Sequence, residues 1–531
     1  MKYKIFYLLI FLLLFNMFSV SAANYGGNLK IKVNQRPLNL NPIYADNKTS
    51  NKINKQIFDT LVSYNQDGEI VANLAESWEM INDATIFIFD LRKDVYFHPY
   101  KIKDREVSKR KRNVTAEDWK WSFEYLSDPK NKSPYAELLK KVKGYEEFIT
   151  GRNSEISGIK IINKYKLEIE LEESFAPFIN NLIKNPAVVM PEEAVINQNL
   201  NFSRKPVGTG SFKLSDFSSN KIVLTRNNNY WKNNHQKEKL PYLDQIEINF
   251  DNNLSLNDDY QNFDMYQLNS ESYLNYSGNK ANYKNYSLKK IVNTNFFFVG
   301  ANYKSDLFKN SNFKNIKETI TLFLDENNFI KNLKLHDFVS PDIEENNSLI
   351  LNKIYNDLKK TKREKNIDNQ DIINPINIVV NDSTKSLEIT DLMKERFKSN
   401  KIELEINKYS WSEYLDIITN SNFNGQLFIM TYNYKNKFEF LSDNFYSNSE
   451  SNYFNYENRR LDNLVDYLKL ENSQSSRKQA YSIIENILID DNPIVFLIQG
   501  ADSYLVTDRI ENLNLLNNIF TKDKFELLYF K

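Results

Sequence analysis

The spacing of hydrophobic positions along the chain predicts a protein that mixes strands and helices. Apolar residues alternate with lysines over 28–33, as in a half-buried strand. Residues 85–91 are apolar on both faces, as in a buried strand. Further on, a strand over 376–380, a helix over 386–399 and a strand over 402–406 follow one another. This order predicts a βαβ unit with parallel strands and hence an α/β fold.

A clear helix start lies within residues 114–126. Thr115 can cap the first turn, and Asp118 lies three residues later, which is the spacing of a capping box. Val114 and Trp119 occupy the two positions of a hydrophobic staple. We therefore expect a helix that is capped by Thr115 and that buries Trp119.

Weaker patterns predict the remaining elements. Asp67-Gly68 is typical of a hairpin turn, and a glycine turn over 207–212 leads into a strand. Residues 251–291 are rich in Asn and Ser and poorly patterned, so we expect a boundary between lobes there. The other expected elements are helices over 51–62, 316–333 and 477–488, and strands over 166–172, 221–226 and 427–430.

The first 22 residues have the three parts of a secretory signal. Lys2 and Lys4 precede an apolar run over 5–15, and small residues follow at 20–22. The alternative is a membrane anchor, but the apolar core of about 14 residues is shorter than the roughly 20 residues of a spanning helix. We therefore expect an exported, soluble protein. Since there is no cysteine to carry a lipid at the cleavage point, we expect it to be free in the periplasm.

The composition argues against several classes of function. Lys and Arg together number 69, as do Asp and Glu, so no global charge attracts nucleic acid. The chain has no cysteine and only three histidines, His98, His235 and His336, which argues against a transition-metal site. About 509 residues remain after the signal, enough for two or three domains that need no disulfides.

The sequence carries no motif for catalysis. It lacks the Gly-rich loop that ends in Lys-Ser/Thr, the G-x-S-x-G elbow and the H-E-x-x-H pair. The segment over 208–210 lacks the third glycine of a dinucleotide loop, and a strand rather than a helix follows it. We therefore expect a protein that is not an enzyme, with no catalytic residue, no metal and no cofactor.

A basic run over residues 101–112 stands out in this balanced chain. It holds seven Lys and Arg residues and two acidic residues. Such a run is either a solvated loop or a surface that docks on an anionic partner. The sequence leaves both interpretations open.

Three blocks of sequence carry a family resemblance. The first comprises LAESWE at 74–79, LRKDVYFH at 91–98 and VTAED at 114–118, the second PVGTGSFKL at 206–214 with 226–227 and 230–231, and the third 440–441, 452–458 and 461–464. The basic run interrupts the first block. In this order the blocks resemble family 5 of the bacterial extracellular solute-binding proteins, the oligopeptide- and dipeptide-binding group. The resemblance runs from about residue 28 to the end.

The resemblance implies an α/β fold with two lobes. It is the fold of a type II periplasmic binding protein with an extra subdomain, mixed sheets and a hinge that closes around the ligand. The implied segments are a signal peptide at 1–22, lobe I at 23–295 with a subdomain at about 66–200, lobe II at 296–498, and a return to lobe I at 499–531.

The implied function is that of a monomeric periplasmic receptor that delivers oligopeptides to the permease subunits of an ABC transporter. A groove that offers backbone N–H and C=O groups binds an extended peptide as an added strand, with little dependence on its sequence. Two alternatives stay open. The same fold can bind a modified peptide, a glycopeptide or a sugar, or it can serve as an exported adhesin or peptide-holding chaperone without a transporter.

The resemblance also points to ligand contacts from both lobes. In the family, a stretch that reads roughly Trp-x-x-Asp-Tyr-x-Asp/Glu-Pro pairs its Asp with the peptide's α-ammonium, and 430–437 corresponds to it here. The Asp position holds Asn433, and the Trp and Pro are absent. A neutral Asn cannot neutralise an ammonium, so either another carboxylate does so or the ligand lacks a free amino terminus. The expected contacts are Asn39, Asn41 and Tyr135 from lobe I, and Met430, Thr431, Tyr432 and Asn433 from lobe II.

Overall fold

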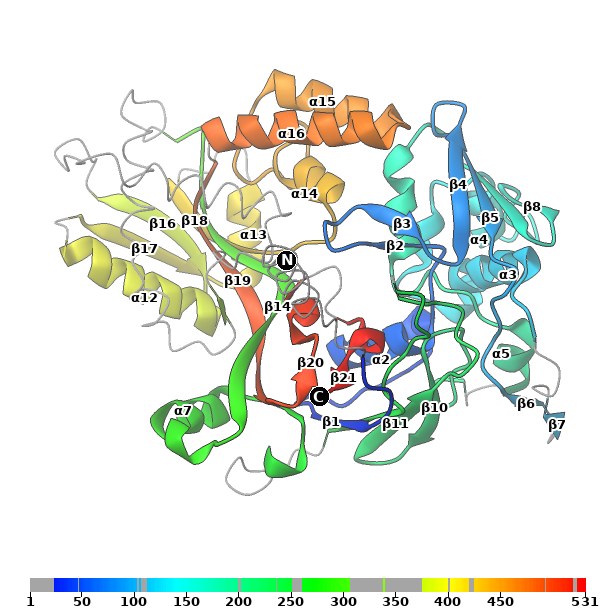
Figure 1. Cartoon of the computed structure of the whole chain (residues 1–531). Coiled ribbons are helices and arrows are strands. Elements are labelled where there is room, and N and C mark those ends of the chain that lie inside the picture. The colour runs from blue at the N-terminus through cyan, green and yellow to red at the C-terminus, as the bar shows by residue number, and fades with distance from the viewer. Residues whose placement is uncertain are drawn as a thin grey trace, which may run out of the picture.

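One mixed sheet of eleven strands runs through the whole molecule (Figure 1). Two long strands, β14 (Tyr286–Ala301) and β19 (Ile494–Thr507), lie side by side at its centre. Beyond β19 come β13 (Met265–Gln267), β1 (Asn28–Lys32), β12 (Gln245–Asn249), β11 (Lys221–Arg226) and β10 (Phe212–Phe217). Beyond β14 come β18 (Leu427–Asn433), β16 (Ile376–Asn381) and β17 (Leu404–Tyr409), while the short β15 (Phe338–Val339) pairs with β19.

The computed structural model describes most of the chain. The described ranges are 23–45, 47–102, 105–106, 112–198, 202–234, 236–250, 260–305, 338–339, 375–399, 402–419, 425–491, 493–518 and 523–531.

The two central strands divide the sheet into two halves. We call the half that contains β10 to β13 lobe I, and the half that contains β18, β16 and β17 lobe II. β14 and β19 pair in one register up to Val292 opposite Ala501, and in another from Phe296 opposite Gln499. The irregularity between these pairs lies where the strands pass from lobe I to lobe II.

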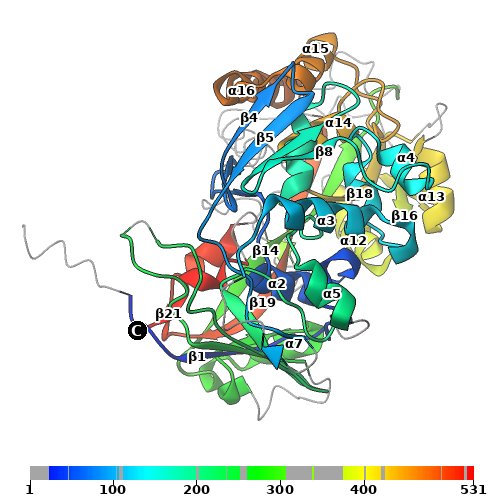
Figure 2. The ribbon, with the colours of Figure 1, turned by 90° about the vertical axis from the view of Figure 1, so that its right-hand side faces the viewer.

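A second, smaller sheet stands on lobe I and forms a subdomain with its helices. Its strand order is β4 (Ala75–Ile81), β5 (Ile86–Leu91), β9 (Lys166–Glu170) and β8 (Ile159–Asn163). Figure 2 shows these strands above β1 and beside α16 (Gln474–Asp491) of lobe II. The helices of lobe I and its subdomain are α2 (Lys48–Ile57), α3 (Ala116–Ser127), α4 (Tyr145–Ile149), α5 (Glu192–Gln198) and α7 (Ser270–Gly278).

The helices of lobe II pack either on its strands or against one another. These are α12 (Thr384–Ser399), α13 (Trp411–Thr419), α14 (Lys437–Asn444), α15 (Arg459–Leu470) and α16. Phe175, at the start of the 3-10 helix η5 (Ala176–Ile183), packs against the cores of both lobes. The lobes therefore touch through the subdomain as well as through the central strands.

Short elements complete the architecture. The strand pairs are β2 (Val62–Tyr64) with β3 (Ile70–Ala72), β6 (Lys101–Ile102) with β7 (Arg105–Glu106), and β20 (Ile510–Glu511) with β21 (Tyr529–Phe530). The other 3-10 helices are η1 (Pro42–Tyr44), η3 (Pro129–Asn131), η4 (Ala136–Leu139), η7 (Tyr260–Asn262), η8 (Lys280–Asn282), η11 (Leu513–Asn517) and η12 (Phe525–Leu527).

Strong local signals in the sequence are confirmed. The capping box of α3 is present between Thr115 and Asp118, and Val114 and Trp119 are both buried. β16 and β17 are parallel neighbours joined through α12, as the βαβ pattern predicts. The hairpin turn at Asp67-Gly68 connects β2 and β3, and Gly68 has a φ of 73°, the left-handed conformation that favours glycine.

One expected helix differs in its bounds, and two expected segments lie outside the described residues. The helix expected over 51–62 begins earlier and ends at Ile57, whose carbonyl accepts a hydrogen bond from the distant Gly210 N–H at 2.8 Å. In the described part of the region over 251–291, which begins at residue 260, α7 and the beginning of β14 are held by a cluster of tyrosines, and the lobe boundary expected in this region stays a prediction. The signal at 1–22 and the helix expected over 316–333 are not among the described residues.

Candidate functional site

The C-terminal part of β18 has one backbone edge that pairs with no strand among the described residues. Tyr434, just after the strand, donates its N–H to the Thr294 carbonyl at 2.7 Å. Because hydrogen-bonded and non-hydrogen-bonded pairs alternate in an antiparallel ladder, Thr431 and Asn433 direct their N–H and C=O groups away from β14. On that side, the described part of β16 pairs with β18 only as far as Phe428. Within the described part of the chain, the backbone N–H and C=O groups that Thr431 and Asn433 direct to this side therefore have no strand partner.

The four expected lobe II residues alternate between the two faces of β18. Thr431 and Asn433 are exposed, whereas Met430 is buried in the core of lobe II. Tyr432 is half-buried, packs against Phe440, and donates its hydroxyl hydrogen to Asp443 Oδ2 at 3.1 Å. Met430 and Tyr432 thus support the strand, and Thr431 and Asn433 are the accessible pair.

Two of the three expected lobe I residues, Asn39 and Asn41, lie on the loop after β1, and Tyr135, just before η4, reaches this loop from the subdomain. Asn39 Oδ1 accepts the N–H of Asn41 at 2.8 Å, and Asn41 Oδ1 accepts the N–H of Ile43 at 3.3 Å. The Tyr135 hydroxyl donates to the Ala45 carbonyl at 2.8 Å. These hydrogen bonds shape the loop and attach it to the subdomain. Leu38, whose exposed fraction is 69 %, is a large hydrophobic side chain that the loop presents to solvent, and no pattern in the sequence pointed to it.

The carboxylates that follow β18 are already engaged by other groups. Glu439 forms ion pairs with Lys184 of the subdomain at 3.0 Å and with Lys435 at 3.2 Å. Burial raises the pKa of Glu439, but the two lysines lower it by more than burial raises it, so the pKa lies below its usual value. Burial is also the main cause of the raised pKa of Asp443, which accepts the Tyr432 hydroxyl. Both carboxylates of α14, which follows Asn433 in the chain, thus already have partners.

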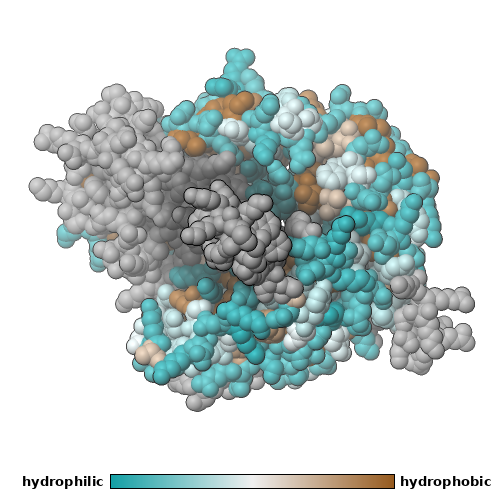
Figure 3. All heavy atoms as spheres, in the orientation of Figure 1, coloured by the Kyte–Doolittle hydropathy of each residue, from teal (hydrophilic) through white to brown (hydrophobic). Residues whose placement is uncertain are grey.

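A cavity of about 740 Å³ lies between the lobes, and none of the seven expected residues lines it. Its lobe I side consists of the β2–β3 turn, β4 and η5, and its lobe II side consists of the first turn of α14 and of α16. Figure 3 shows that the described surface on this side of the molecule is largely hydrophilic, with scattered hydrophobic residues. Trp78 and Glu79, which line the cavity, belong to the first sequence block, but nothing in that block indicated a cavity.

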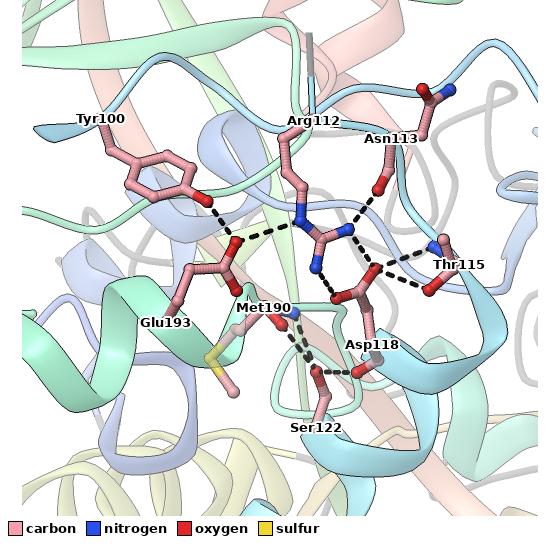
Figure 4. A network of polar contacts seen from close by, with 8 residues as sticks. All are labelled: Tyr100, Arg112, Asn113, Thr115, Asp118, Ser122, Met190 and Glu193. Atoms are coloured by element: carbon pink, nitrogen blue, oxygen red, sulfur yellow. Dashed lines mark hydrogen bonds and ion pairs between the residues drawn. The ribbon is translucent and has the colours of Figure 1, made fainter. Parts of the chain in front are cut away.

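The basic run is fixed to the subdomain where its C-terminal end meets α3. Figure 4 shows Arg112 between Asp118 and Glu193, with Tyr100 donating its hydroxyl to the same Glu193. The Arg112 Nε atom lies 3.0 Å from Glu193 Oε1, and Asp118 also accepts the N–H of Thr115 at 2.8 Å. Tyr100, which precedes the basic run, and Arg112, which ends it, are thereby held against α3 and α5.

The described residues lack two features. They contain no helix that is long and apolar enough to cross a membrane. They also contain no group of three or more His, Cys, Asp or Glu side chains placed to hold a metal ion.

Comparison with known proteins identifies similar chains along almost the whole length. Residues 69–452 match the family described as bacterial extracellular solute-binding proteins, family 5 Middle. The chain is 22% identical over 514 residues to the oligopeptide-binding protein OppA of Bacillus subtilis, which covers 91% of this chain and 90% of that protein.

Solved structures give the same result for the fold. The unliganded open form of the murein tripeptide-binding protein MppA superimposes with a TM-score of 0.74 at 17% identity, covering 96% of this chain and 99% of the other. The Helicobacter pylori protein DppA, solved with the peptide STSA, superimposes with a TM-score of 0.58 at 20% identity, covering 96% and 98%. The two-lobed periplasmic binding protein fold is confirmed.

Proposed function

Because the chain belongs to family 5 of the bacterial extracellular solute-binding proteins, a family of binding proteins and not of enzymes, we propose that it captures oligopeptides between its lobes. We further propose that it acts as a monomer in the periplasm and delivers the peptide to the permease of an ABC transporter. In this proposal, the edge of β18 at Thr431 and Asn433 and the loop around Asn39 and Asn41 would contact the peptide.

The single observation that carries this proposal is the open edge at Thr431 and Asn433. An extended peptide laid against this edge forms backbone hydrogen bonds with two residues whose own side chains are exposed. Such bonds do not depend on the peptide's sequence, and water can fill the space around its side chains. This arrangement fits a receptor that accepts many peptides.

The polar irregularity between β14 and β19 suits a hinge. Asn293 accepts the Asn295 N–H on its side-chain oxygen at 2.9 Å and the Gln499 side-chain amide on its carbonyl at 3.1 Å. Beside it, Gly500 leaves no room for a side chain, since a Cβ atom there would lie 2.5 Å from Asn293 Oδ1. We place the boundaries of lobe II at this point, at 296 and 498, and propose that the lobes close here around the ligand.

A modified peptide is the second candidate ligand, and the charges around Asn433 favour it. A free α-ammonium would meet a neutral Asn433, while the neighbouring Glu439 is paired with Lys184 and Lys435. A peptide whose amino terminus is blocked, or a non-peptide ligand, avoids this loss of charge pairing. An exported adhesin or peptide-holding chaperone remains the alternative from another class, and transport of bound peptide in cells distinguishes it from a receptor.

The test is a pair of substitutions at one position. Thr431→Pro removes an N–H that points away from β14 and so leaves the β14–β18 ladder intact, whereas Thr431→Ala keeps the N–H. We expect a mixture of short peptides to bind to the wild type and to Thr431→Ala in native mass spectrometry, but not to Thr431→Pro. Equal binding to the proline variant would show that the edge of β18 is not the peptide site.

A further inference from the structure

The cavity between the β2–β3 turn and α16 has broad apolar walls. Tyr64, Trp78 and Met80 line it from lobe I, and Phe438 and Tyr481 line it from lobe II. Trp78 and Met80 are only partly buried, so their side chains are available to a ligand. The volume of about 740 Å³ lies within the range of pockets that hold small organic molecules.

The charges of this cavity are unevenly paired. Its three basic side chains are all engaged: Lys437 with Glu485 at 3.3 Å, Lys478 with Glu69 at 2.9 Å, and Arg477 with the carbonyls at the end of α15. Two further carboxylates, Asp67 and Glu79, line the cavity and have no ion-pair partner among the described residues. The lining therefore holds four carboxylates and three cations, of which Arg477 has only neutral carbonyl partners, so the net charge of the cavity is −1.

An unused hydrogen-bond acceptor lies in the same wall. The side-chain oxygen of Asn472 is shielded from solvent and accepts no hydrogen bond within the described part of the chain. A shielded acceptor without a donor costs free energy. Because this oxygen is shielded, the Asn472 side chain must turn toward the cavity before an N–H group of a ligand can donate to it and remove this cost.

We propose that this cavity binds an organic cation, an ammonium or guanidinium group attached to an apolar body. The cation would lie near Glu79 and Asp67 and over the aromatic faces, which attract positive charge. Its N–H groups would donate to Asn472, and the apolar body would contact Trp78 and Met80.

Such a ligand would contact both lobes at once. The cavity adjoins the contact between Phe175 and Phe438, whose ring centroids are 5.7 Å apart, so a bound cation adds to a contact that already joins the lobes. The inference rests on this cavity alone and holds whether or not a peptide binds along β18.

The test uses two probes that differ in charge and match in shape. Nα-acetyl-arginine amide carries the cation, and Nα-acetyl-citrulline amide is its neutral counterpart. We expect isothermal titration calorimetry to detect the arginine compound and to give an affinity about tenfold higher than that of the citrulline compound, as a charge-assisted contact implies.

Matched substitutions locate the binding. Glu79→Gln is expected to weaken the arginine compound about fivefold and to leave the citrulline compound unchanged. Glu76→Gln is the control, because Glu76 is an exposed carboxylate on the same strand that does not line the cavity. Asn472→Ala removes the proposed acceptor at a second position of the cavity, and we expect it to weaken the binding of the arginine compound as well.

Several results would overturn the proposal: no binding of the arginine compound, equal binding of the two probes, or an equal loss in Glu79→Gln and Glu76→Gln. Thr431→Pro separates this site from the peptide site, since it should leave the arginine compound bound. If it abolishes that binding as well, the cation binds along β18 and not in the cavity.

Discussion

Two titratable groups attached to one glycine loop are predicted to give opposite pH dependences of stability. His98 is 3 % exposed, and its Nε2 atom lies 2.9 Å from the Gly210 carbonyl. With Nε2–H donating there, Nδ1 is buried and has no partner among the described residues, so a second proton would have no acceptor. Burial, aided by the charge of Lys213, lowers the pKa of His98 to about 4.

Asp59 contacts the same glycine loop, residues 207–212, and its pKa is shifted in the opposite direction. Its carboxylate accepts the Thr209 hydroxyl at 2.9 Å and the Trp231 N–H at 3.3 Å. Burial raises its pKa to about 6, with a smaller contribution from Glu526. The positive charge of Lys232 opposes this shift without cancelling it.

Whether acid raises or lowers the stability depends on which state, folded or unfolded, binds the proton more tightly. The unfolded chain binds the His98 proton more tightly, so acid removes about 2 kcal/mol of stability between pH 8 and pH 5. The folded chain binds the Asp59 proton more tightly, so the same change adds about 1.4 kcal/mol. In the wild type the two contributions nearly cancel. Asp59→Asn keeps an acceptor for Thr209, and we expect this variant to lose stability between pH 8 and pH 5. His98→Gln keeps a donor for Gly210, and we expect this variant to gain stability over the same range.

The assay is urea unfolding of the wild type and both variants at pH 8 and pH 5, with an NMR titration of the imidazoles. The chain has three histidines, so the His98 signal can be assigned by its loss in His98→Gln. The other titratable groups change the unfolding free energy of all three proteins alike. The test therefore compares how the unfolding free energy of each protein changes between pH 8 and pH 5. A His98 resonance that titrates near 6.5, or parallel pH dependences in all three proteins, would refute the reasoning.

Three further outcomes can be checked with single substitutions. Gly500→Ala pushes a Cβ atom against Asn293 Oδ1 and breaks its bond to Asn295, so we expect a loss of about 1–2 kcal/mol in thermal unfolding, whereas Gly278→Ala, which meets no atom within 4 Å, should change little. Tyr135→Phe removes the hydrogen bond to Ala45 and should cost about 1 kcal/mol, and an unchanged unfolding midpoint would contradict a structural role for that hydroxyl. Asn433→Asp should strengthen the binding of peptides with a free amino terminus, and calorimetry that shows no gain would separate Asn433 from the ammonium position.

The sequence alone determined those features that depend on neighbouring residues. The Thr115–Asp118 cap, the Asp67-Gly68 turn and the parallel β16–β17 pair follow from local chemistry and hydrophobic period, and all three are present. The family resemblance, and with it the two-lobed fold, also came from short blocks of sequence.

Tertiary structure decided what depends on residues far apart in the chain. The end of α2 is set by Gly210, about 150 residues away from Ile57. The roles of Asn39, Asn41 and Tyr135 are set by the backbone groups with which each of these side chains forms a hydrogen bond. The open edge of β18 and the cavity beside Trp78 arise only when separate segments meet. Periodicity reports which side of a strand or helix is buried, but it does not report what lies opposite, and binding sites are made from what lies opposite.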